Sequence, residues 1–234
     1  MIPKHLITTI FLTAIMGIFS AATAAKATFQ TSSVGKWTGP ELYIKQSSDL
    51  TPLQLHSVAI SQPYTYRQGS AIEIHAKEDP TRKSSRTSLI ATIDIPGHIS
   101  QPLIVFVPND EENEEKPEKL RYLVLDLSTM VYSGGTLRFV NLSEDKLEVS
   151  LGDNAEKLKP NAVKVIEHRG DDPHKVAFNV TLLPSDEEAT KVRDVGTMLL
   201  TRPTKRMTVF IDTTVNKRGK KLLTFLTLVD YLSQ

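Results

Sequence analysis

The sequence predicts an all-β protein, with two tandem immunoglobulin-like β-sandwich domains after a cleaved signal peptide. Apolar and polar residues alternate with a period of two in segment after segment, for example in Ala71–His75 and in Ala162–Ile166. Such alternation places one face of a strand on a core and the other in water. Turn residues such as Gly134-Gly135 separate these segments about every 10–15 residues. No window keeps the apolar period of 3.6 residues that a long amphipathic helix requires.

We interpret each alternating segment as one strand, because glycine, proline or polar turn residues bound it on both sides. The strands expected lie near residues 41–46, 53–61, 64–68, 71–78, 88–95, 102–108, 121–127, 136–143, 146–152, 162–168, 175–183, 192–201, 206–214 and 221–231. One helix of one or two turns is expected over Ser185–Val192, since Ser185 suits an N-cap and acidic residues follow it. Fourteen strands suit two sandwiches of about seven strands each.

The two halves of the chain share a pattern. Each contains an apolar strand, a charged loop and a second apolar strand: Leu103–Val107 with Leu123–Leu127, and Met207–Ile211 with Leu226–Asp230. Each half also opens on a similar segment, Leu42–Ser47 or Leu137–Ser143. A repeat of about 100 residues indicates tandem copies of one domain.

We therefore expect one domain over residues 26–130 and a second over 131–234, with the boundary in Ser128–Gly135, where Ser133-Gly134-Gly135 interrupts the pattern. One fused sandwich is the alternative, because any two hairpins share an alternating pattern.

Residues 1–25 have the order of features of a secretory signal peptide. Lys4 gives a positive start, Leu6–Phe19 is an apolar run too short to span a bilayer comfortably, and the small residues Ala22–Ala25 suit signal peptidase. An uncleaved membrane anchor is the alternative, but an anchor gains nothing from the small residues after Phe19. Cleavage after Ala25 leaves 209 of the 234 residues, and we expect an exported protein, periplasmic or extracellular.

The composition argues against several classes of function. The mature chain balances 27 Lys and Arg against 27 Asp and Glu, so we expect no nucleic-acid partner. After the signal, no apolar run approaches the roughly 20 residues of a transmembrane helix. The absence of cysteine excludes disulfides, thiol nucleophiles and a lipid-modified N-terminal cysteine, and is typical of bacterial envelope proteins.

His168, Asp171, Asp172 and His174 form the one local cluster that resembles a metal site, because imidazole and carboxylate groups are ligands for zinc and similar ions. Gly170, the two aspartates and Pro173 equally suit a tight surface turn, which is the favoured interpretation. The acidic run Asp110–Glu115 lacks the spaced carboxylates of a calcium loop. We expect it in a solvated hairpin loop between two adjacent, central antiparallel strands.

Tyr64 and Tyr66 lie two residues apart and therefore share one face of a strand. Exposed in a row, they would stack on sugar rings, as in carbohydrate-binding sandwiches. The same spacing fits two core tyrosines, and the core is the favoured interpretation. Trp37 is either a core residue or an exposed contact.

The chain contains no G-x-S-x-G, H-E-x-x-H or G-x-x-x-x-G-K-[ST] motif, so we expect no enzyme activity and no cofactor. The stretch Gly134–Ser143, followed by Leu151-Gly152 and Leu158–Asn161, resembles a pattern of uncharacterised exported bacterial β-sandwich proteins. It is also similar to periplasmic adaptor domains that assist polysaccharide acetylation. The resemblance covers about residues 134–168 and implies a scaffold or adaptor.

The function predicted is that of a non-enzymatic exported envelope protein, a structural or protein-interaction module that binds through a sheet edge or a loop surface. A carbohydrate-binding module, or an adaptor for polysaccharide modification, is the alternative. The partner expected is an envelope protein or a surface glycan.

Overall fold

The computed structural model describes residues 25–46, 49–57, 59–77, 86–108, 120–167, 175–183, 192–199 and 204–232. Every regular element in these ranges is a strand, so the all-β prediction is confirmed. Outside them lie residues 1–24 of the expected signal peptide, the acidic run Asp110–Glu115, the four metal-site candidates His168, Asp171, Asp172 and His174, and residues 185–191 of the expected helix. In the described ranges no helix is long and apolar enough to cross a membrane.

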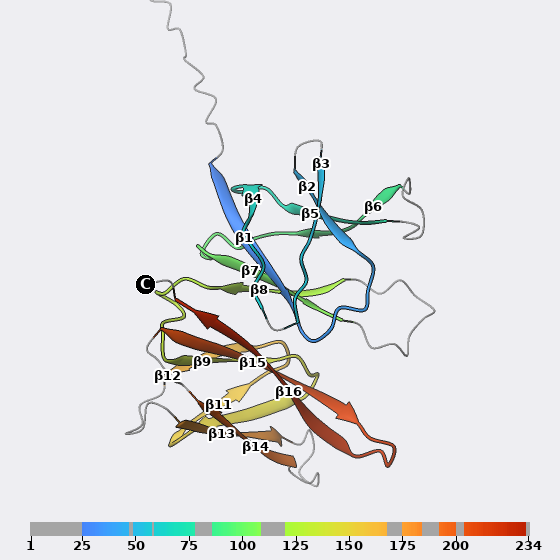
Figure 1. Cartoon of the computed structure of the whole chain (residues 1–234). Helices are drawn as coiled ribbons and strands as arrows, with labels where there is room; N and C mark the ends of the chain where they lie inside the picture. Colours follow the sequence, from blue (N-terminus) through green and yellow to red (C-terminus); the bar gives the residue numbers. More distant parts are fainter. Residues whose placement is uncertain are drawn as a thin grey trace, which may run out of the picture.

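The first eight strands form two four-stranded sheets, ordered β4-β1-β7-β8 and β3-β2-β5-β6 (Figure 1). We call this pair the N-terminal sandwich. Its strands are β1 (Lys26–Ser33), β2 (Leu42–Gln46), β3 (Asp49–Pro52), β4 (Tyr64–Arg67), β5 (Ile72–Lys77), β6 (Thr87–Ile93), β7 (Pro102–Val107) and β8 (Arg121–Asp126).

The last eight strands form the sheets β12-β9-β15-β16 and β11-β10-β13-β14, which we call the C-terminal sandwich. Its strands are β9 (Thr136–Asn141), β10 (Lys146–Leu151), β11 (Asn154–Leu158), β12 (Val163–Glu167), β13 (Lys175–Leu183), β14 (Val192–Leu199), β15 (Lys205–Val215) and β16 (Lys221–Tyr231).

The two sandwiches have the same strand order, with β9 to β16 in the places of β1 to β8. In both, the first strand pairs in parallel with the seventh: β1 with β7, and β9 with β15. The other strand pairs are antiparallel. The segment between β8 and β9, residues 127–135, contains the whole of the range expected for the boundary, Ser128–Gly135.

Each sandwich encloses a core of its own. The N-terminal core includes Phe29, Ile44, Ile74, Ile93 and Phe106, and the C-terminal core includes Leu137, Phe139, Val149, Val180 and Val209. Residues of both sheets contribute to each core, because alternate residues of every strand point inward.

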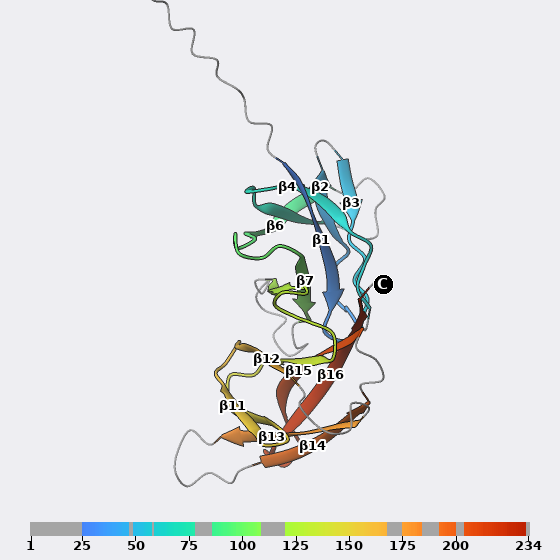
Figure 2. The same ribbon diagram turned by 90° about the vertical axis from the view of Figure 1, so that its left-hand side faces the viewer.

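A third cluster, the junction core, joins the two sandwiches. It contains Val34, Leu103, Val105, Val107, Leu125, Leu127 and Tyr132 from the N-terminal half and linker, with Val140, Leu142, Phe210 and Leu228 from the C-terminal half. The outer faces of sheets β4-β1-β7-β8 and β12-β9-β15-β16 therefore pack on each other, and the two sandwiches stack along one axis (Figures 1 and 2). Since both of their faces are covered, every residue of β7 and of β9 is buried.

Strand β1 is absent from the strands that the sequence predicts, and the strand expected over 53–61 is wrong. The end of β1 is polar, yet Thr31, Ser32 and Ser33 are buried. Their hydroxyls donate to backbone carbonyls: Thr31 to Gln54 at 2.8 Å, and Ser32 to His56 at 3.1 Å. Residues 53–57 and 59–61 thus form no strand, and several of them bond to β1 instead, although their sequence alternates.

The repeat identified in the sequence needs two corrections. Segment 137–143 corresponds to β1, not to the segment 42–47, because β9 takes the place of β1 and β2 that of β10. Matching Leu103–Val107 with Met207–Ile211 pairs the correct strands one residue out of register. Phe106 points into its sandwich core, whereas Phe210 points into the junction core. A slip of one residue exchanges the two faces of a strand.

Two further differences concern edges of sheets. The expected neighbours over 102–108 and 121–127 do pair antiparallel, but only β7 is central, and β8 ends its sheet. The short strands β3 and β11 were not expected. β11 follows a two-residue turn at Gly152, where φ is 57°. Its sequence, Asn-Ala-Glu-Lys-Leu, is mostly polar and does not alternate, so the pattern used to predict strands misses it.

Candidate functional site

The structure places both candidate stacking tyrosines against the N-terminal core. Tyr64 is buried and its ring stacks on Phe29 with the centroids 5.4 Å apart, while its hydroxyl accepts a hydrogen bond of 2.7 Å from the N–H of Gln54. Tyr66 meets Phe29 edge-on at 5.9 Å and is half-buried. Burial raises the pKa of Tyr66. This placement agrees with the core interpretation, since the Tyr64 ring has no open face for a sugar.

Trp37 is half-buried and meets Phe106 edge-on at 6.1 Å, and its indole N–H donates to the carbonyl of Pro40 at 2.9 Å. Of the two roles that the sequence leaves open, the structure shows packing at the rim of the N-terminal core.

No group of three or more His, Asp or Glu side chains in the described ranges is arranged to hold a metal ion. An open groove lies between β11, β12 and the linker residue Val131. Its acids include Asp153 and Glu156, and Glu156 pairs with Lys164 at 3.3 Å. Nothing in this groove brings together a nucleophile and a base.

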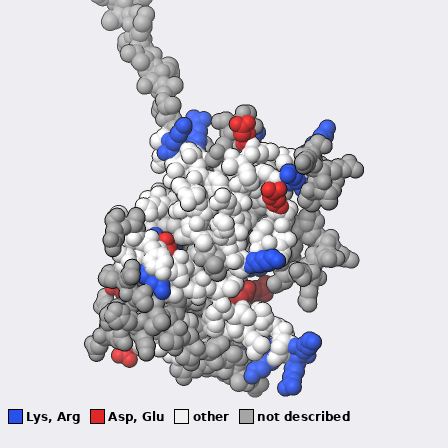
Figure 3. All heavy atoms as spheres, viewed as in Figure 1, with Lys and Arg blue, Asp and Glu red and all other residues white. Residues whose placement is uncertain are grey.

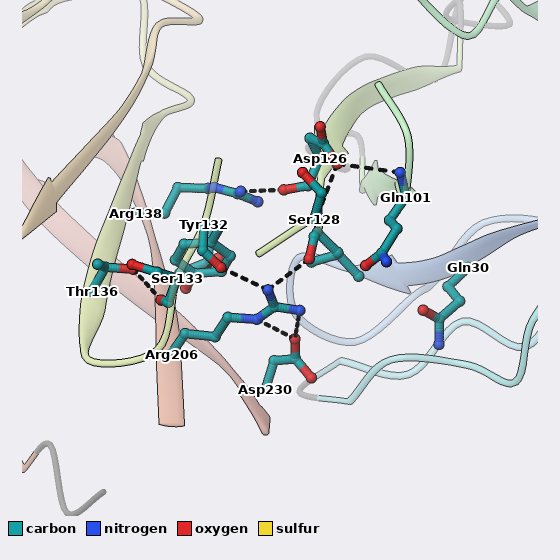
Figure 4. Close-up of polar contacts among 12 residues, drawn as sticks. Gln30, Gln101, Asp126, Ser128, Tyr132, Ser133, Thr136, Arg138, Arg206 and Asp230 are labelled. Carbon is teal, nitrogen blue, oxygen red and sulfur yellow. Dashed lines mark hydrogen bonds and ion pairs between the residues drawn. The ribbon is translucent and has the colours of Figure 1, made fainter. Parts of the chain in front are cut away.

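The most elaborate polar cluster lies at the junction (Figure 4). The ring of Tyr132, in the linker, sits between two arginines of the C-terminal sandwich. The guanidinium carbon of Arg138 on β9 is 3.9 Å from the ring centroid, and that of Arg206 on β15 is 5.0 Å away. All three side chains are buried, so these cation–π contacts form away from water, where they are strongest.

Arg206 connects the linker to the C-terminal sandwich. Its Nη1 donates to the backbone carbonyls of Leu127 at 2.6 Å and Tyr132 at 2.7 Å. Its Nε and Nη2 contact Asp230 on β16 at 2.7 and 2.5 Å, which compensates the buried charge. The linker is held by the fork of donors that only arginine offers.

Arg138 is less completely satisfied. Its Nη2 donates to the carbonyl of Asp126 at the end of β8, but its Nη1 is buried without a hydrogen-bond partner among the described residues. Burial lowers the pKa of Arg138 to about 10. Burial likewise raises the pKa of Tyr132, so its phenol stays neutral at physiological pH.

The carboxylate of Asp126 anchors the start of the linker. Its Oδ1 accepts from the N–H of Ser128 at 2.8 Å and from that of Gln101 at 3.2 Å. Burial alone would raise the pKa of Asp126, but hydrogen bonds from Ser128, Gln101 and Ser100 outweigh burial and lower it. Among the described residues the polar groups of this cluster bond to one another or are buried, so the cluster joins the two sandwiches. A small hollow beside it, lined by Val107, Arg121 and Leu142, contains no pair of a nucleophile and a base.

The feature that stands open is an edge of the N-terminal sandwich. The described sheets end in eight edge strands, and the sequences of seven contain a charged residue, which in general disfavours pairing with another chain: β3 (Asp49), β4 (Arg67), β8 (Arg121), β11 (Lys157), β12 (Lys164), β14 (Arg193) and β16 (Lys221). β3 also contains Pro52. β6 has neither charge nor proline over its whole length, Thr87–Ile93.

A β-bulge exposes the apolar side chains of β6. Ile74 pairs with Ala91 and His75 with Leu89, so Ile90 is an extra residue. Ile93 and Ala91 face the core, and strict alternation would also turn Leu89 inward. The bulge instead leaves Leu89 53% and Ile90 39% exposed, side by side on an uncharged edge.

A comparison with models of known protein families finds none that matches this sequence, and a search of curated proteins finds no match either. The interpretation of the site therefore depends on its own geometry. The strand expected here, residues 88–95, includes Asp94, whereas β6 begins at Thr87, ends at Ile93 and contains no charged residue. That it lies at an edge follows only from the strand order.

Proposed function

We propose that this protein is an exported, non-enzymatic interaction module that binds a partner protein by strand addition at β6. The observation that carries the proposal is the uncharged edge of β6, which differs from the other seven described edge strands. A partner strand adds to a free edge through main-chain hydrogen bonds, and exposed side chains along the edge select its sequence.

The chemistry of β6 defines the partner segment. With Leu89 and Ile90 exposed and no charge from Thr87 to Ile93, the edge fits an extended, uncharged segment with apolar side chains. A charged segment that paired with β6 would lose part of its hydration and would meet no opposite charge on this strand. The locked junction supports this role, because β6 then has a fixed orientation relative to the C-terminal sandwich.

Site-specific photo-crosslinking in the producing cells tests the proposal. A photoreactive residue at Leu89 or Thr92 is expected to give an adduct with a partner polypeptide, and one at Val163 on β12 is not. Val163 is a matched control, since it is an exposed apolar residue (42%) on an edge strand that carries charge.

In the same assay with the probe at Thr92, Ile90→Lys is expected to abolish the adduct, because a charge on an edge blocks pairing, whereas Val163→Lys is expected to leave it unchanged. Equal adducts at all three probe positions, or none, would contradict the proposal. An adduct of twice the mass of the chain would identify a second copy in place of a different partner.

A further inference from the structure

The hairpin β15–β16 is longer than the sheet that carries it. β15 pairs with β16 from Lys205 to Val215, but with β9 only from Met207 to Ile211. The last residues of β15 and the first residues of β16 therefore run past the neighbouring strand as a two-stranded ribbon, which projects from the C-terminal sandwich (Figure 1). Its tip is the turn 216–220.

This turn has a defined shape, which Asn216 organises. The Asn216 Oδ1 accepts from the N–H groups of Arg218 at 2.9 Å and Lys220 at 3.0 Å, and the Asn216 N–H donates to the Lys220 carbonyl at 2.9 Å. Gly219 adopts a φ of 74°, which glycine takes without strain. The side chains on the turn are therefore presented by a preformed loop.

The turn concentrates positive charge. Lys217, Arg218 and Lys220 are exposed, and none has a side-chain hydrogen bond or ion pair within the part of the chain that the structure describes. Lys221 instead binds Asp145 at 2.7 Å, which ties the ribbon to the β9–β10 turn. Figure 3 shows the basic side chains gathered at the lower right, where Figure 1 places the end of the hairpin.

Apolar side chains flank this charge. Val215, the last residue of β15, is 64% exposed, and Leu222, near the start of β16, is 42% exposed. Thr214 pairs with Leu222 and Val215 pairs with Lys221, so the two apolar side chains lie on opposite faces of the ribbon. A ribbon that meets a surface end-on immerses both of them together with the turn.

We infer that the tip of hairpin β15–β16 binds the surface of an anionic lipid bilayer. Cations next to exposed aliphatic side chains fit the boundary between phosphate headgroups and acyl chains, where the charges attract the headgroups and the apolar groups leave water. A soluble polyanion would make no apolar contact with Val215 and Leu222 and would leave both side chains in water. The protein would then bind a membrane from one end and a protein partner at β6.

The test uses the mature protein and co-sedimentation with vesicles. Binding is expected to phosphatidylglycerol–phosphatidylcholine vesicles at low salt, to weaken at high salt, and to be absent with phosphatidylcholine alone. The triple variant K217S/R218S/K220S is expected to lose roughly a hundred-fold in partitioning, at about five-fold for each cation. The matched control K45S/K146S/K159S removes three exposed lysines elsewhere and is expected to bind as the unaltered protein does.

The variant V215S/L222S separates a membrane from a soluble polyanion. It is expected to lose vesicle binding while any retention on a heparin column stays the same. Absence of vesicle binding by the unaltered protein, equal loss in the two triple variants, or vesicle binding by V215S/L222S at full strength would each overturn the inference. Ile90→Lys is expected to bind vesicles normally, so failure of one proposal is distinguishable from failure of the other.

Discussion

The guanidinium of Arg138, on the first strand of the C-terminal sandwich, lies 3.9 Å from the ring centroid of Tyr132 in the linker. Arg206 contacts the same ring at 5.0 Å and also holds the linker carbonyls of Leu127 and Tyr132. A single aromatic side chain thus connects the linker to two strands of the second sandwich. This arrangement predicts that the two sandwiches unfold together.

Tyr132→Ala is expected to destabilise the protein by about 3–5 kcal/mol, because it leaves a cavity in the junction core. Tyr132→Phe is the matched control and is expected to cost about 1 kcal/mol, since it removes only the hydroxyl, whose bond with Thr208 is 3.3 Å long. Urea unfolding measures both changes.

The single tryptophan distinguishes the sandwiches in the same experiment. Trp37 fluorescence reports the N-terminal sandwich, whereas far-ultraviolet circular dichroism reports both. The two transitions are expected to coincide in the unaltered protein and to separate in Tyr132→Ala. Coincident transitions in Tyr132→Ala would contradict the coupling assigned to this ring.

Arg206→Met is expected to cost about 3 kcal/mol, because it leaves Asp230 and two linker carbonyls without their partner. Arg138→Met is expected to cost only about 1 kcal/mol, since it gives up one hydrogen bond but also removes a buried nitrogen that has no partner within the described residues. Thermal melts followed by circular dichroism give the order of the two variants. The reverse order would show that the cation–π stack of Arg138 outweighs the ion pair.

Acid is expected to weaken the junction through Asp126. Its folded pKa is depressed, so its contribution is present above the unfolded value of about 3.9 and is lost as the pH falls through the folded value. Asp126→Asn is expected to reduce the fall in the urea midpoint between neutral pH and about pH 3. Asp153→Asn, at an exposed turn, is the control. An unchanged acid dependence in Asp126→Asn would contradict this account.

Asn141→Asp is expected to destabilise the C-terminal sandwich by about 3 kcal/mol or more. The Asn141 side chain is fully buried, and its Nδ2 donates to the carbonyls of Asp145 at 2.7 Å and Lys159 at 3.1 Å. The Oδ1 accepts from the N–H and the hydroxyl of Ser143 and would keep these donors, but the oxygen that replaces Nδ2 would face carbonyl oxygens with no donor. Asn154→Asp changes an exposed amide in the same sandwich and is expected to have little effect in chemical denaturation. Equal losses of unfolding free energy in the two variants would contradict the role assigned to the buried Asn141 amide.

The sequence predicts strands well where burial on one face produces alternation. β5, with Ile72, Ile74 and Ala76 inward, is the clear example. The prediction fails where polar residues are buried by bonds to distant loops, as in β1, because Thr31 and Ser32 find their acceptors in residues 54–59. No local pattern encodes such a partner.

The candidate site has the same limit. The uncharged run of β6 is visible in the sequence, but whether a strand is central or at an edge depends on pairing across the whole domain. The junction is harder still to foresee. Arg138 and Arg206 alternate with apolar residues like any outward-facing cations, and only the packing of one sandwich on the other buries them.

The parallel pairing of first and seventh strands has a consequence for how the chain folds. Gln30 pairs with Leu103, and Leu137 with Met207, so each sandwich closes across 73 or 70 positions of sequence. Topologies rich in such distant pairings fold slowly, in milliseconds to seconds. During synthesis β1 is made long before β7 exists to receive it, and Leu103 and Val105 remain uncovered until Phe210 and Leu228 have also been made. The time at which the last strands are released, rather than the speed of any hairpin, therefore sets the earliest moment at which the native protein can form.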